Sequence, residues 1–106
     1  MELIKRLADH TGKREEKFYK ATLFQSDTLL LGINCVEPGQ IQMPHDHADQ
    51  DKFYYIVEGS GRFWLGKDRQ MATEGDVVWA PAGLVHGVEN RGNGRLTMLV
   101  GIAPAP

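Results

Sequence analysis

The sequence predicts an all-β domain, built as an antiparallel barrel or a two-sheet jelly roll. Short apolar or β-branched stretches alternate with Gly/Pro-rich turns at intervals of about eight to twelve residues. No helical pattern separates these stretches, which argues against a parallel sheet with crossover helices. A length of 106 residues without a linker predicts one domain over residues 1–106.

The elements are expected in a simple order along the chain. Residues 1–16 form a polar extension, in which Leu3, Ile4 and Leu7 have helical spacing and predict a short helix or turn. The barrel is expected to cover residues 17–102, and the proline-containing tail 103–106 cannot extend a strand. The nine strands are expected at residues 17–24, 28–36, 40–43, 52–58, 61–65, 70–73, 76–80, 86–89 and 95–102.

Composition excludes several classes of function. A net charge of −2, without a clustered basic face, predicts no nucleic-acid partner. No apolar run has the length of a membrane span or a signal peptide, so no membrane association is expected. The single Cys35 excludes an intrachain disulfide and is typical of a reducing compartment. We therefore expect a cytoplasmic protein.

The stretch 28–36 is apolar on both of its faces. Leu29, Leu31 and Ile33 would lie on one side, and Leu30 and Val36 on the other. A strand that is covered on both sides in so small a domain favours a homodimer. The alternative is that the N-terminal segment covers the outer face within one chain.

Three histidines are the candidate metal ligands. On a strand, His45 and His47 would share one face about 6.5 Å apart, and both could reach one ion at about 2.0–2.1 Å. His86 follows the turn Pro81-Ala82-Gly83, which would aim it back along a neighbouring strand. This spacing predicts a site in which His45, His47 and His86 bind one metal ion.

The two histidine segments resemble the signature motifs of the cupin superfamily. The matching positions are Gly39, His45, His47 and Gly59 in the first motif, and Gly75, Pro81, Gly83, His86 and Asn90 in the second. The resemblance implies a double-stranded β-helix, usually dimeric, with one divalent metal ion in the barrel mouth bound by the three histidines. Iron, manganese, nickel, cobalt and zinc all suit imidazole, so the identity of the metal stays open.

One position departs from the family pattern, because Lys52 stands where cupins commonly have a ligating glutamate. A protonated amine about 4 Å from a dication would be repelled by about 8 kcal/mol at an effective dielectric of about 20. The amine must therefore be neutral, turn away, or pair with an acid such as Glu58 or Asp51. Asp51 faces the opposite side of the strand unless a bulge re-aims it. Three alternatives remain: a three-histidine site, a site completed by Asp51 or Gln50, and a metal-poor pocket.

Two further residues are pocket candidates. Tyr54 shares a face with Lys52, so its hydroxyl either meets a substrate or belongs to a core tyrosine. Met43 lies two residues before His45, and it either lines the cavity or serves packing.

A neutral ligand set favours a chelating, anionic oxygen ligand. The predicted function is thus a metal-dependent enzyme acting on a small oxygenated molecule. An iron site would suit an oxidoreductase of the dioxygenase type. A redox-inert ion would suit an isomerase or lyase, with Lys52 as the candidate base. The alternatives are a non-catalytic module that binds a sugar or an organic acid, and a metal-free epimerase or cyclase.

Overall fold

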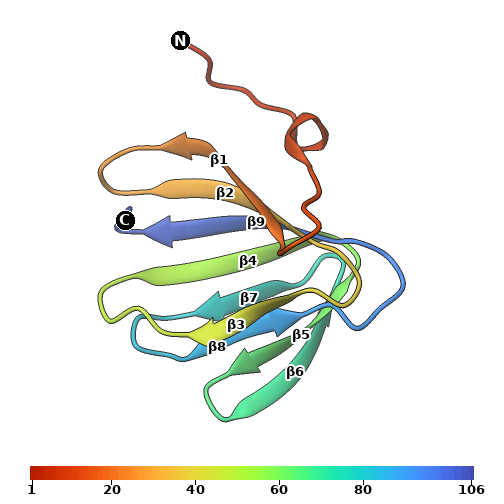
Figure 1. The fold of residues 1–106 in the computed structure, drawn as a ribbon. Coiled ribbons are helices and arrows are strands. Elements are labelled where there is room, and N and C mark those ends of the chain that lie inside the picture. The colour runs from red at the N-terminus through yellow and green to blue at the C-terminus, as the bar shows by residue number, and fades with distance from the viewer.

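The computed structural model describes residues 1–106 and contains nine strands in two antiparallel sheets (Figure 1). One sheet has the strand order β1-β2-β9-β4-β7, and the other has the order β3-β8-β5-β6. The strands are β1 (Tyr19–Gln25), β2 (Leu30–Val36), β3 (Ile41–His45), β4 (Asp51–Glu58), β5 (Ser60–Leu65), β6 (Asp68–Thr73), β7 (Val77–Ala80), β8 (His86–Glu89) and β9 (Leu96–Ala103). The two sheets pack face to face as a double-stranded β-helix, which confirms the expected fold class.

The strand boundaries lie within two residues of the expected ones, and the N-terminal element is shorter than expected. The helix is a single 3-10 turn, η1 (Leu7–His10), while Leu3 and Ile4 are exposed. One turn forms few backbone hydrogen bonds, so its position depends on the contact that Leu7 makes with the sheet. No helix of this chain is long and apolar enough to cross a membrane.

The core lies between the sheets and follows from the alternation of the strands. Ten buried residues form it, and Tyr54, Phe63, Ile56 and Met98 are among the largest. Along β4, every second side chain turns inward, so that Lys52 lies on the same face as Tyr54 and Ile56. The inward row of β4 therefore changes from core to pocket at Lys52.

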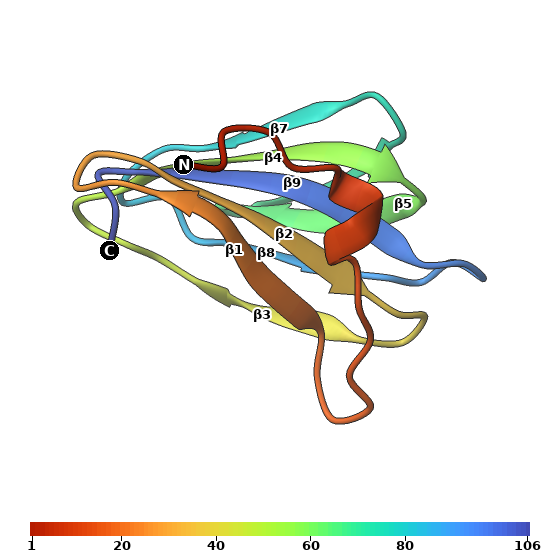
Figure 2. The same cartoon turned by 90° about the horizontal axis from the view of Figure 1, so that it is seen from above.

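The outer face of β1 and β2 is covered within the chain. Leu23, Ile33 and Cys35 form a second apolar cluster there, and Leu7 of the N-terminal turn packs against it. Figures 1 and 2 show this turn on the β1–β2 side of the molecule. The N-terminal segment thus helps to cover the apolar outer face of β2 within one chain. This is the alternative to coverage by a partner subunit.

Two glycines of the two motifs fix loops at opposite ends of the barrel. Gly59 joins β4 to β5 with φ of +83°, and a Cβ at this position would lie 2.3 Å from the carbonyl oxygen of Arg95. Gly83 has φ of +84°, and its N–H donates a 2.9 Å hydrogen bond to the carbonyl of His47. The loop before β8 is thereby tied to the loop after β3, which brings the two histidine segments together.

Candidate metal and ligand pocket

A pocket of about 440 Å³ opens at one end of the barrel, between the two sheets. One wall is the inner face of β1, β2, β9 and β4. The other wall comes from β3 and the loop that follows it. His45, His47, Gln50 and Lys52 all line this pocket. Residues from the first recognised motif and from the strand that follows it therefore meet at one opening.

The three histidines are neighbours in space. His45 ends β3 and pairs directly with His86, which begins β8, and their ring centroids are 4.5 Å apart. The ring centroid of His47 lies 4.9 Å from that of His45 and 6.2 Å from that of His86. Contrary to the expectation, His47 does not share a strand with His45, because β3 ends at His45 and His47 lies in the following exposed loop.

In two of these rings, Nδ1 is hydrogen-bonded to a backbone carbonyl. Nδ1 of His45 donates to the carbonyl of Met43, and Nδ1 of His86 donates to the carbonyl of Leu84, both at 2.9 Å. A carbonyl only accepts, so the neutral rings keep a lone pair on Nε2. Nε2 of His86 is buried without any hydrogen-bond partner. A buried, orphaned nitrogen with its tautomer fixed in this way is typical of a metal-ligating imidazole.

The spacing of the rings meets the requirements of a metal site only in part. Imidazoles that share an ion at about 2.0–2.1 Å place their ring centroids roughly 4.5–5 Å apart. The two pairs that include His45 satisfy this spacing, whereas the pair of His47 and His86 is wider at 6.2 Å. In this structure no group of three ligand side chains is arranged to hold a metal ion. The donor chemistry fits a divalent ion, and His47 is the side chain that must turn to complete the set.

The electrostatic environment keeps two of the rings neutral. Burial lowers the pKa of His47, the charges of His45 and Lys52 lower it further, and Asp46 raises it. Burial also lowers the pKa of His86, against an upward effect of its hydrogen bond to Leu84. Neutral imidazole is the form that binds a metal ion, so lowered pKa values extend metal binding to lower pH.

Lys52 faces the pocket and has no acidic partner. The residue is 7% exposed, and its Nζ lies 4.7 Å from the ring centroid of Tyr54. Burial lowers the pKa of Lys52 to about 8, and the nearby charge of Lys20 contributes to the shift. Glu58, one expected partner, instead accepts a 2.6 Å hydrogen bond from Oγ1 of Thr97. Of the outcomes foreseen for this lysine, the structure favours a readily neutralised amine inside the pocket.

The two candidates for a fourth ligand lie in different places. Asp51 begins β4 on the face opposite to Lys52, and its Oδ1 accepts a 2.9 Å hydrogen bond from the N–H of Ala82. Asp51 thus faces away from Lys52, as strict alternation predicts, and the alternative in which it completes the metal site is not supported, because its carboxylate caps a loop outside the pocket lining. Gln50 does line the pocket, and its Nε2 donates to the carbonyl of Pro104 at 3.1 Å. Its Oε1 has no partner in the chain.

A β-bulge in β3 overturns the expected position of Met43. Gln42 pairs with Val88 and His45 with His86, so β3 contains one residue more than β8 over this interval. The extra residue turns Gln42 inward, and leaves Met43 69% exposed outside the pocket lining. Gly87 allows the bulge, because a Cβ at this position would lie 2.6 Å from the carbonyl oxygen of Gln42.

Tyr54 is a core residue, and its hydroxyl does not face the cavity, which is one of the two interpretations that the sequence allowed. It is fully buried, and its hydroxyl donates a 2.6 Å hydrogen bond to Oε1 of Gln42. Burial raises the pKa of this phenol, so the hydroxyl keeps its proton. Tyr54 therefore acts beneath the pocket, by orienting Gln42, and does not line the cavity itself.

Comparison with known proteins decides the family. A sequence model of the cupin domain matches residues 32–102, which include all three histidines. This chain belongs to the cupin family. Solved structures agree: the cupin resembles the TT1209 protein of Thermus thermophilus with a TM-score of 0.93 and 36% identity, over 97% of this chain and 98% of that one.

Two further similarities define the range of relatives. A structure from Thermotoga maritima described as a predicted oxalate decarboxylase has 28% identity and a TM-score of 0.75, over 79% of this cupin and 77% of that chain. An uncharacterized protein of Methanocaldococcus jannaschii is 33% identical over 64 residues, which cover 60% of this cupin and 51% of the relative. The cupin spans about half the length of the curated relatives that it matches.

The structure adds three pocket residues that the sequence did not point to. Lys20 on β1, Asn34 on β2 and Gln42 on β3 all line the cavity. Asn34 had a usable signal, because it is the one polar side chain in a strand of otherwise apolar residues. Gln42 gave no such signal, because strict alternation from His45 would turn it outward. Only the bulge turns it inward.

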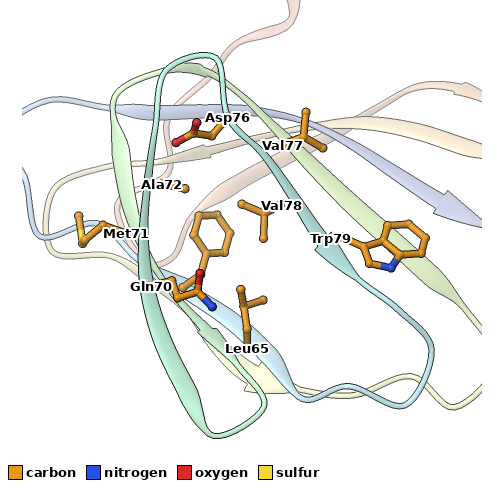
Figure 3. A pocket seen from close by; sticks show the side chains of 9 residues that line it. Leu65, Gln70, Met71, Ala72, Asp76, Val77, Val78 and Trp79 are labelled. Atoms are coloured by element: carbon orange, nitrogen blue, oxygen red, sulfur yellow. The ribbon is translucent and has the colours of Figure 1, made fainter.

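A second cavity lies away from the histidines. It measures about 320 Å³ and lies between β5, β6 and β7 (Figure 3). Leu65, Met71, Val78 and Trp79 are among its mostly apolar lining residues. Its one acidic group, Asp76, accepts a hydrogen bond from the N–H of Thr73 through Oδ2 at 2.8 Å. Asp76 is the one titratable group in this lining.

Proposed function

We propose that this cupin is a metal-dependent isomerase or lyase that acts on a small, oxygenated organic acid. Three imidazoles, His45, His47 and His86, would hold a divalent ion, with Gln50 as the candidate for a fourth ligand. Such an ion, when bound, would polarise a carbonyl or carboxylate oxygen of the ligand and would so acidify an adjacent C–H bond. These metal ligands alone would suit a dioxygenase equally well, so the choice between the two chemistries depends on another residue.

The position of Lys52 is the observation that carries the proposal. A general base must be close to the reacting carbon and must lose its proton easily. Lys52 lies in the same cavity as His45 and His47, is almost fully buried, and forms no ion pair that would hold its proton. A dioxygenase has no evident use for such an amine, whereas an isomerase or lyase needs one. The predicted decarboxylase from T. maritima is of the lyase type.

Proton exchange tests this proposal without knowledge of the product. Metal-loaded protein is incubated in D2O with a panel of small keto and hydroxy acids, and loss of the substrate C–H signal is followed by NMR. We expect exchange of a proton adjacent to a carbonyl, at a rate that Lys52→Met reduces about 100-fold or more and that a chelator abolishes. Lys67→Met, on an exposed turn away from the pocket, is the matched control.

The other outcomes each identify a competing function. Exchange that survives the chelator would indicate metal-free acid–base chemistry, as in an epimerase. Substrate-dependent uptake of O2 without proton exchange would indicate a dioxygenase. Tight binding of an organic acid or sugar with neither reaction would indicate a binding module. Any of these results would overturn the proposal.

We also propose that the chain forms a homodimer. The outer face of β2 no longer supports this, because Leu7 helps to cover it. Support comes from β6 and β7, where Met71, Val77 and Trp79 are all more than half exposed. Large exposed apolar side chains on two consecutive strands are typical of a protein–protein interface.

A further inference from the structure

The charge of the pocket lining is unbalanced. Fourteen residues line the cavity, and they include Lys20, Lys52 and two histidines but no aspartate or glutamate. The two amines are close enough to repel each other, since burial and the charge of Lys20 both lower the pKa of Lys52. Positive charge in a partly enclosed cavity, with no carboxylate side chain in its lining to balance it, favours the entry of an anion.

Asn34 provides a second and independent sign of a ligand. The residue is 7% exposed, lines the cavity, and its side chain forms no hydrogen bond within the chain. Its amide atoms open to the cavity, since Nε2 of His86 is the one enclosed side-chain nitrogen or oxygen without a partner, so they are available to a ligand. Asn34 lies directly opposite Lys20 in the β1–β2 ladder, so both side chains project from the same face of the sheet. A buried, unpaired amide and an amine therefore stand side by side at the pocket wall.

Gln42 contributes a third donor from the opposite sheet. Tyr54 donates to Oε1 of Gln42, which leaves the amide NH2 group without a partner in the chain. That group belongs to a side chain that lines the cavity. The hydrogen bond from Tyr54 thus selects which end of the amide is offered to a ligand, and the end it leaves free is the donor.

We propose that Lys20, Asn34 and Gln42 form a subsite that binds an oxyanion group of the ligand, in the cavity that His45 and His47 also line. The inference rests on the proposed function only in using the same pocket, and it narrows the substrate class to small molecules with a carboxylate or a phosphate. Lysine and amide N–H groups that converge from two strands and a facing sheet suit the acceptor-only oxygens of such a group. Lys52 remains free for proton transfer.

Binding of simple anions to the metal-free protein tests the subsite apart from catalysis. The protein is treated with a chelator, and malonate, inorganic phosphate and uncharged malonamide are titrated calorimetrically. We expect malonate or phosphate to bind and malonamide not to bind, and the stronger of the two anions identifies the source of the oxyanion. Because the contact is electrostatic at a partly exposed site, the affinity should fall as salt is raised.

Substitutions then assign the binding to the named residues. Lys20→Gln should weaken anion binding about tenfold, whereas Lys20→Arg should largely retain it. Asn34→Asp, which has nearly the same shape but adds a negative charge, should abolish it. Lys67→Gln removes the same charge from an exposed turn outside the pocket and should leave the affinity unchanged. Melting curves confirm folding, and Lys20 is exposed enough for its substitution to be tolerated.

Equal affinities for malonate and malonamide would overturn the subsite. So would equal losses in Lys20→Gln and Lys67→Gln, since these indicate nonspecific charge attraction. The two proposals fail separately. Anion binding that depends on Lys20, combined with no proton exchange in the metal-loaded protein, would sink the enzymatic proposal alone. Exchange that depends on Lys52, without anion binding by the metal-free protein, would sink the subsite alone.

Discussion

The hydroxyl of Tyr54 donates a 2.6 Å hydrogen bond to Oε1 of Gln42, and this bond joins the core to the ligand pocket. Tyr54 comes from β4 of the five-stranded sheet, and Gln42 comes from β3 of the facing sheet. Both residues are buried. The bond therefore has two consequences, since it satisfies a buried acceptor and it orients an amide at the pocket wall.

Tyr54→Phe should lower the free energy of unfolding by about 1–2 kcal/mol, because it leaves a buried amide oxygen without its donor. Urea denaturation of the two proteins measures the difference. The matched control is Tyr55→Phe, which removes a hydroxyl from a neighbouring exposed residue and should change stability by less than about 0.5 kcal/mol. Equal effects of the two substitutions would mean that the bond to Gln42 has no special value.

His47→Ala should reduce the metal affinity of the protein by at least about tenfold, because it removes one of three imidazole ligands. Elemental analysis after reconstitution, together with competition against a chromogenic chelator, measures the loss. His10→Ala provides the control, since His10 belongs to the N-terminal turn, away from the pocket. Full metal occupancy in His47→Ala would contradict the proposed site.

Lys52→Met should stabilise the protein at neutral pH. The pKa of Lys52 is about 8 in the folded state and about 10.5 when exposed, so the unfolded chain binds the proton more tightly. Between these pH values the wild type gains stability as pH rises, and below about pH 8 it carries the full penalty, which is about 3 kcal/mol at most. Urea denaturation at pH 7 and at pH 10 should show the advantage of the variant shrinking at the higher pH. A constant difference would contradict the lowered pKa.

Gly59→Ala should destabilise the fold by about 3 kcal/mol or more, because it combines a left-handed backbone with a Cβ that meets the carbonyl of Arg95. Thermal and urea unfolding measure the loss. Gly94→Ala is the comparison, as its backbone is not left-handed and a Cβ there meets nothing within 4 Å. Similar stabilities of the two variants would show that Gly59 is not required by its conformation.

Trp79→Glu should convert a dimer into a monomer, because it places a charge among the exposed apolar side chains of β6 and β7. Light scattering coupled to size-exclusion chromatography measures the mass. Ile4→Glu alters a still more exposed apolar residue, in the N-terminal segment, and should leave the mass unchanged. A wild type that is already monomeric at high concentration would refute the dimer.

Sequence reasoning succeeded where one rule of spacing governs a segment. The nine strands follow from alternation and turn residues, and the double-stranded β-helix is confirmed. The proximity of His45 and His86 follows from the two motifs, since the turn at Gly83 sets them opposite each other. Whether Lys52 turns toward the site was left open by the sequence, and the structure places it on the same inward face of β4 as Tyr54.

The failures have a common physical source in local departures from regular strands. The bulge in β3 places Gln42 at the pocket instead of Met43, and a pattern with a period of two residues cannot predict a bulge. The carboxylate of Asp51 is occupied by the N–H of Ala82, which lies 31 positions away in the chain. Contacts of this kind depend on how two loops meet, so the residues of one strand cannot reveal them.

The extra residue in β3 also indicates how such a barrel can change its specificity. If the extra residue lay before Gln42 instead of after it, Met43 would pair with Val88, and a thioether would then occupy the space of the Gln42 amide. The polarity of the entrance would be altered without any substitution at the pocket wall. A shift of the bulge along this strand is thus a short evolutionary route between relatives of one architecture that recognise different compounds.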